Sequence, residues 1–84
     1  MKIAKSRSWT GVEVQEAVTA LKREPGLWED LARIEATTGE FREVEAGVQE
    51  ARIVTRLHPE CELNEITDLL LAIRLYRCAA LGLR

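Results

Sequence analysis

The stretch "LWEDLARIEATTGEFREVEAG", residues 27–47, predicts two helices joined by a tight turn. Trp28 stands one helical turn ahead of Ala32, where a small side chain lets another helix approach. Gly39 follows, and glycine commonly ends a helix because it adopts a positive φ without a steric penalty. We expect the hairpin to be held together by six structural residues: Trp28, Leu31, Ala32, Gly39, Phe41 and Val48.

Apolar residues at helical spacing continue on both sides of this stretch. Thr10-x-x-Glu13 has the form of a capping box at the start of a first helix. Pro25-Gly26 separates the first helix from the second, and His58-Pro59 ends the third, because the residue before a proline is disfavoured in helical geometry. The expected helices cover residues 11–23, 27–36, 41–57 and 64–81. The sequence therefore predicts an all-α fold, a small bundle of about four helices built on antiparallel helical hairpins.

The length and composition indicate a single domain. A chain of 84 residues buries only about 60% of the surface of its unfolded form, so it has room for one modest core. The hydrophobic fraction of 46% and the charged fraction of 31% fit a folded domain. We expect residues 1–84 to form one helical domain, with residues 1–9 as a flexible basic N-terminal arm that carries Lys2, Lys5 and Arg7.

Neither a secretory signal nor a membrane span is expected. Residues 1–10 contain no apolar segment typical of a signal peptide, and the longest apolar run, residues 69–73, is far too short to cross a bilayer. Cys61 and Cys78 are seventeen residues apart in one predicted helical stretch. That separation corresponds to about 25 Å of helix, too far for a disulfide. We therefore expect a cytoplasmic protein with reduced thiols.

The residues from Trp28 to Pro59 resemble a tetratricopeptide repeat. The shared features are the opening Trp28-x-x-Leu31-Ala32, the turn at Gly39 and the proline near the end. The resemblance implies a helical hairpin that binds another protein, and the secretion chaperones built from such repeats are one family context. An ordinary antiparallel hairpin would show the same spacing.

A second pattern is similar to Myb/SANT domains. Trp9, Trp28 and Val48 follow one another at intervals of about nineteen residues, as the bulky residues of those three-helix domains do. Members that bind DNA place basic or amide side chains of the third helix in the major groove. Here the third helix is acidic in part, with Glu40, Glu43, Glu45 and Glu50 beside Arg42, Arg52 and Arg56. We interpret this resemblance, too, as favouring a protein partner.

The residue types needed for catalysis or metal binding are sparse. His58-x-x-Cys61 is the one candidate metal pair, and Cys78 or Glu62 would have to complete it. Structural zinc usually takes four ligands as two closely spaced pairs. No residue that could orient a Cys–His nucleophile is evident, and the glycines are isolated rather than grouped in a phosphate loop. We expect no enzymatic activity, no metal and no cofactor.

The last predicted helix suggests a binding function because it is apolar on two faces. Ile66, Leu69, Leu70, Ile73 and Tyr76 form one face, and Leu71, Leu75 and Cys78 form the other. Three short helices should not cover both. The expected partner-binding residues are Leu71, Leu75, Arg74, Arg77 and Trp9.

We therefore expect a non-catalytic protein–protein interaction module: an adaptor, a small chaperone or an inhibitor of a larger protein. It would bind another protein, itself, or both, as an oligomer. The alternative is a small DNA-binding regulator that uses the Myb-like helices and the basic arm. The net charge of -2 weighs against nucleic acid.

Overall fold

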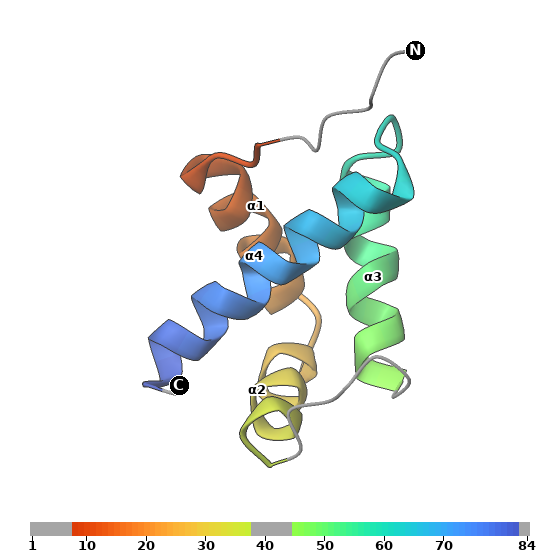
Figure 1. Ribbon diagram of the computed structural model, residues 1–84. Coiled ribbons are helices and arrows are strands. Elements are labelled where there is room, and N and C mark those ends of the chain that lie inside the picture. Colours follow the sequence, from red (N-terminus) through yellow and green to blue (C-terminus); the bar gives the residue numbers. More distant parts are fainter. Residues whose placement is uncertain (1–7, 38–44, 83–84) are drawn as a thin grey trace.

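The computed structural model describes residues 8–37 and 45–82, and these residues form four helices and no strand. The helices are α1 (Gly11–Lys22), α2 (Leu27–Thr37), α3 (Glu45–Leu57) and α4 (Leu63–Leu81). Each helix contacts the other three (Figure 1). The predicted all-α bundle is confirmed. The predicted bounds of α1, α2 and α4 agree with the structure to within one residue. The expected start of the third helix, at Phe41, lies outside the described residues.

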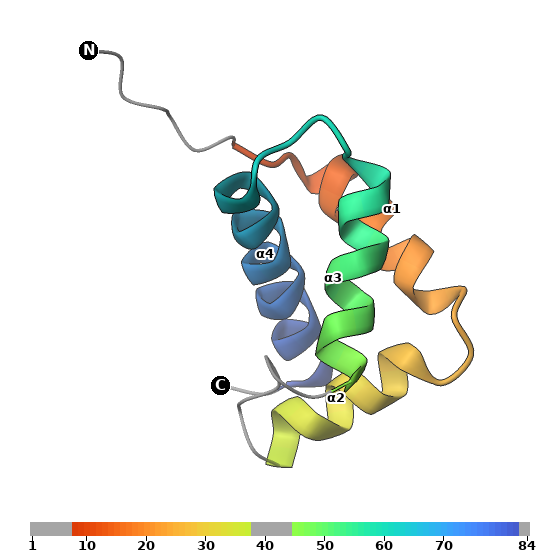
Figure 2. The same ribbon diagram turned by 90° about the vertical axis from the view of Figure 1, so that its right-hand side faces the viewer.

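The longest helix, α4, organises the bundle. α3 and α4 run antiparallel and are joined by the loop of residues 58–62, and α2 lies across the end where α3 begins and α4 ends (Figure 2). One side of α4 packs against the other three helices, which leaves its opposite side for other contacts.

None of the described helices is long and apolar enough to cross a membrane.

The helix ends follow local sequence rules. The Glu13 N–H donates to the Thr10 hydroxyl at 3.2 Å, and the Thr10 N–H donates to the Glu13 carboxylate at 3.0 Å, which is the predicted capping box. Gly26, between α1 and α2, has a φ of +78°, and Gly82 ends α4 with a φ of +74°. Both conformations favour glycine because a Cβ atom there is strained. Gly39, the glycine expected to end the second helix, lies outside the described residues.

The core draws side chains from all four helices. Its buried apolar residues are Ala17, Val18, Leu21, Leu27, Leu31, Val54, Ile66, Leu69 and Ile73. Trp9, Trp28, Leu70 and Tyr76 are among the partly buried residues that pack against it. The expected structural role of Leu31 therefore agrees with its place in this core.

The buried side of α3 differs from the prediction. The sequence analysis expected Val48 to be a structural residue of this helix, together with Phe41, which lies outside the described residues. In the structure Val48 is 44% exposed, and the fully buried positions of α3 are Glu50 and Val54. The expected structural role of Val48 is thus wrong. On the buried side of α3 the Glu50 carboxylate pairs with Arg77, and Val54, Ala46 and Ile53 pack in or against the core.

Candidate functional site on helix α4

The side of α4 that faces away from the core carries exposed leucines. Ile66, Leu69, Ile73 and Arg77 are buried, at spacings of three and four residues. Leu71 and Leu75 lie on the other side of the helix, one turn apart, with exposed fractions of 54% and 62%. The sequence predicted a second apolar face at these residues, and the structure places that face in solvent.

A groove runs beside Leu71, between α3 and α4. Its volume is about 550 Å³, and it is lined by Gly47, Glu50, Ala51, Thr67, Leu70, Leu71 and Arg74. On the α3 side the groove is lined by Gly47 and Ala51, and their small size would let a side chain of a bound partner approach the backbone of α3. On the α4 side two leucines lie between Thr67 and Arg74. An apolar floor with a few polar groups at its ends is the usual composition of a binding groove.

Arg77 does not belong to this surface, although the sequence analysis placed it there. Its side chain is fully buried, and its Nε and Nη1 atoms donate to Glu35 and Glu50 at 3.0 and 3.1 Å. Its guanidinium carbon lies 5.0 Å from the centre of the Trp28 ring. Arg77 is therefore a core residue that links α4 to α2 and α3, and its expected role as a surface contact is corrected.

Arg74 does reach the surface. Its side chain is 41% exposed and borders the groove, and its Nε atom donates to Glu35 at 2.6 Å. Glu35 thus accepts a hydrogen bond from each of the two arginines, one on each carboxylate oxygen. This bond joins Arg74 to the interior cluster while the rest of its side chain borders the groove.

The two buried carboxyls have opposite pKa shifts. Burial raises the pKa of Glu35, but hydrogen bonds from Cys78, Arg77 and Arg74 outweigh that effect and hold the pKa below its ordinary value. Burial also raises the pKa of Glu50, and there Arg77 offsets only part of the rise. The hydrogen bond with Glu35 in turn raises the pKa of the Cys78 thiol. Cys78, expected on the face of Leu71 and Leu75, therefore contacts the charge cluster.

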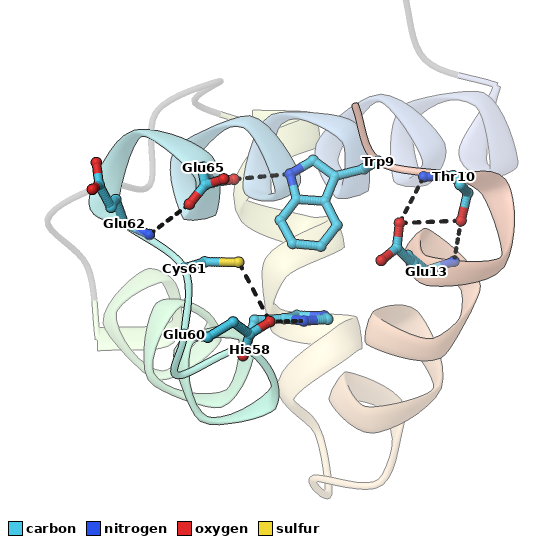
Figure 3. A network of polar contacts seen from close by, with 8 residues as sticks. All are labelled: Trp9, Thr10, Glu13, His58, Glu60, Cys61, Glu62 and Glu65. Carbon is cyan, nitrogen blue, oxygen red and sulfur yellow. Dashed lines mark hydrogen bonds and ion pairs between the residues drawn. The ribbon is translucent and has the colours of Figure 1, made fainter. Parts of the chain in front are cut away.

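Trp9 makes contacts within the domain. Its indole N–H donates to the Glu65 carbonyl at 2.9 Å, and its ring packs edge-on against His58, with 4.7 Å between the ring centres (Figure 3). The last residue of the expected arm is thereby anchored to the start of α4. Its expected contact with a partner stays a prediction.

Of the remaining residues expected to be structural, Trp28 and Ala32 are half-buried. The Trp28 ring meets Tyr76 edge-on at 6.3 Å. Gly39 and Phe41 lie outside the described residues. Glu35 and Glu50 are interior residues that were not predicted from the sequence. A signal was present, because Glu35 follows Trp28 and Leu31 at helical spacing on the apolar side of its helix.

Comparison with protein-family models, curated proteins and solved structures found no match to this chain. The resemblances to tetratricopeptide and Myb/SANT domains accordingly stay predictions from the sequence.

Proposed function

We propose that this chain is a non-catalytic protein-interaction module that binds through Leu71, Leu75, Arg74 and the adjoining groove, together called the α4 surface. The observation that carries the proposal is the exposure of Leu71 and Leu75, one turn apart, beside a groove that ends in a fixed arginine. Apolar side chains next to an arginine are frequent in the energetic centres of protein interfaces.

The α4 surface is rigidly supported. Leu69 and Ile73, fully buried, fix the opposite side of the same helical turns, and Glu35 holds Arg74. A surface that is already ordered loses little conformational entropy on binding, which favours affinity. A suitable occupant is a helix of another protein, or of a second copy, that presents apolar residues beside an acidic one. Adaptors, small chaperones and inhibitors all use contacts of this kind.

The double variant Leu71→Asp, Leu75→Asp tests the proposal. We expect it to stay helical by circular dichroism, because neither side chain contributes to the core. It should lose self-association in sedimentation equilibrium, or lose the proteins that the wild type captures from its native host, identified by mass spectrometry. Val12→Asp is the matched control, since Val12 is 69% exposed on α1 and lies outside the groove.

Two results would contradict this proposal. The first is a wild-type chain that is monomeric and captures nothing. The second is a double variant that stays folded and keeps the same partners as the wild type and the Val12→Asp control.

One observation favours the alternative, a small DNA-binding regulator. Glu50 was one of the acidic residues expected on the third helix that weighed against DNA binding, but Glu50 is buried. The exposed residues of α3 include Gln49, Arg52 and Arg56, the amide and guanidinium types that read base edges. A mobility shift on mixed-sequence DNA that weakens as salt rises, and that Arg52→Ala and Arg56→Ala abolish, would support the regulator. The net charge of -2 makes it the second candidate.

A further inference from the structure

The loop between α3 and α4 brings three potential metal ligands together. The Oε2 atom of Glu60 lies 3.6 Å from His58 Nδ1 and 3.7 Å from Cys61 Sγ (Figure 3). The three ligand atoms all lie within 4.8 Å of one another. They come from different side-chain types, an imidazole, a carboxylate and a thiol, so the cluster is not simply a patch of acidic residues.

The backbone of the loop explains this convergence. The His58 N–H still donates to the Val54 and Thr55 carbonyls, at 3.3 and 3.2 Å, so His58 is fixed to the end of α3. The Cys61 N–H then donates to the His58 carbonyl at 3.1 Å, which closes a tight turn over Pro59 and Glu60. All three ligands are thus placed by one short turn between two packed helices.

We propose that His58, Glu60 and Cys61 bind one Zn²⁺ ion. With bonds of about 2.0–2.3 Å, ligand atoms around a tetrahedral zinc lie about 3.3–3.8 Å apart. Two of the three separations already fall in that range, and the third, between His58 and Cys61, is no more than 4.8 Å. The thiol and imidazole favour zinc over Mg²⁺ and Ca²⁺, which prefer oxygen ligands. Binding releases the thiol proton, because the thiolate is the ligand.

The surroundings hold the imidazole in place. The side chain of His58 is only 16% exposed, and the Trp9 ring packs against it while donating its N–H to the Glu65 carbonyl. Residues that support a ligand in this way lower the cost of ordering it when the metal arrives. Glu60, by contrast, is 62% exposed, so the fourth position of a zinc ion faces solvent. Three protein ligands and one open position are the arrangement of sites where water or a further ligand coordinates the metal.

The expectation of no metal rested on the need for a fourth ligand from Cys78 or Glu62. Cys78 cannot supply it, because its thiol interacts with Glu35 at the far end of α4. The Glu62 side chain points away from the other three ligands (Figure 3). The structure therefore points to a site with three protein ligands. The sequence prediction had considered only zinc sites with four ligands in two pairs.

The test is a titration of the reduced full-length chain with Co²⁺ and then with Zn²⁺. We expect one equivalent of Co²⁺ to produce sulfur-to-cobalt charge-transfer absorption and Zn²⁺ to remove it by displacement. Cys61→Ser should abolish the band and weaken Zn²⁺ binding at least about 10-fold, and His58→Gln should weaken it similarly. Cys78→Ser is the matched control and should bind as the wild type does. Circular dichroism of each variant separates lost binding from lost folding.

Trp9 gives an independent signal because its ring contacts His58. In a Trp28→Phe background, one equivalent of Co²⁺ should quench the remaining tryptophan fluorescence. The proposal is overturned if the wild type binds neither metal at about 100 μM. It is also overturned if the charge-transfer band survives Cys61→Ser and is lost in Cys78→Ser, since the thiolate ligand would then be the other cysteine.

Discussion

Arg77 and Glu50 form an ion pair inside the helix bundle, with 3.1 Å between Nη1 and Oε2 and exposed fractions of 0% and 2%. The pair joins α4 to α3, and Glu35 extends it to α2 through a second bond from Arg77. Burial of charges costs desolvation energy that their attraction often fails to exceed, so such a cluster is weak support for stability by itself. The cluster connects side chains of α2, α3 and α4 in the interior of the bundle.

The first prediction is that Arg77→Ala strongly destabilises the domain. The substitution leaves Glu35 and Glu50 buried without their shared cation, and breaking a buried pair in this way costs about 3–5 kcal/mol. That loss is comparable with the whole free energy of unfolding of a small domain. Urea denaturation followed by circular dichroism measures it.

The control removes the charges together. In the triple variant Glu35→Leu, Glu50→Leu, Arg77→Met, no buried charge lacks a partner, and we expect most of the lost stability to return. If Arg77→Ala unfolds at the same urea concentration as the wild type, the buried cluster does not exist in solution.

The second prediction concerns pH and follows from the opposite shifts of the two carboxyls. The folded-state pKa of Glu35 is lowered, so its contribution to stability is present above its ordinary value of 4.5 and is lost as the pH falls. The folded-state pKa of Glu50 is raised, so its contribution is fully present below 4.5 and is lost as the pH rises through the raised pKa.

Thermal denaturation of Glu35→Gln and Glu50→Gln between about pH 3 and 7 checks both signs. The difference between wild type and Glu35→Gln should be largest near neutrality and shrink on acidification. The difference between wild type and Glu50→Gln should grow on acidification. If the two differences from wild type instead change with pH in the same direction, the two carboxyls share one environment.

The helices and the character of α4 could be predicted from the sequence because local chemistry decides them. The pattern Thr10-x-x-Glu13 identified the start of α1, Pro25-Gly26 separated α1 from α2, and His58-Pro59 ended α3. Helical periodicity also separated the buried Leu69 from the exposed Leu71. Each of these features depends on residues within one or two turns of one another.

The pairing of the interior charges could not be predicted in the same way, because the partners are far apart in the sequence, although helical spacing alone placed Glu35 on the apolar side of its helix. Glu35 and Arg77 are 42 residues apart, and either alone is most simply interpreted as solvated helix surface. The prediction placed Val48 among the structural residues and Glu50 on the surface, and the structure shows the reverse: Glu50 is buried and Val48 is 44% exposed. The sequence identified His58-x-x-Cys61 as a candidate metal pair but not Glu60 as its third member, because that depends on how tightly the turn between α3 and α4 closes.

The third prediction concerns Gly26, between α1 and α2. A Cβ atom at this position would meet no heavy atom within 4 Å, so a substitution acts through the backbone strain at φ +78° and not through a clash. We expect Gly26→Val to destabilise the domain by about 1–2 kcal/mol and Gly26→Asn by less, since asparagine tolerates the left-handed region better. Equal thermal midpoints for the two variants would show that the turn relaxes to another conformation.

The fourth prediction is that Trp28 stabilises the domain through the buried arginine as well as through its own packing. Its ring lies 5.0 Å from the guanidinium of Arg77 and 5.1 Å from the Lys22 ammonium, and it meets Tyr76 edge-on. Trp28→Ala should cost roughly 3 kcal/mol, because it removes a large aromatic that packs against the core. Trp28→Phe keeps a ring and should cost less. Lys22 also lies over the Trp28 ring but is exposed. Lys22→Met should therefore lower the free energy of unfolding by no more than about 1 kcal/mol.

A double-mutant cycle separates the contribution of Arg77 from that of packing. We expect Trp28→Phe and Arg77→Lys to be non-additive by about 0.5 kcal/mol or more in urea denaturation, because the buried guanidinium is paired with the ring. Trp28→Phe and Lys22→Met should be additive within error, since an exposed ammonium is solvated in both backgrounds. Additivity in the first pair would mean that the indole ring attracts the Arg77 guanidinium no more strongly than a phenyl ring attracts the ammonium of a lysine.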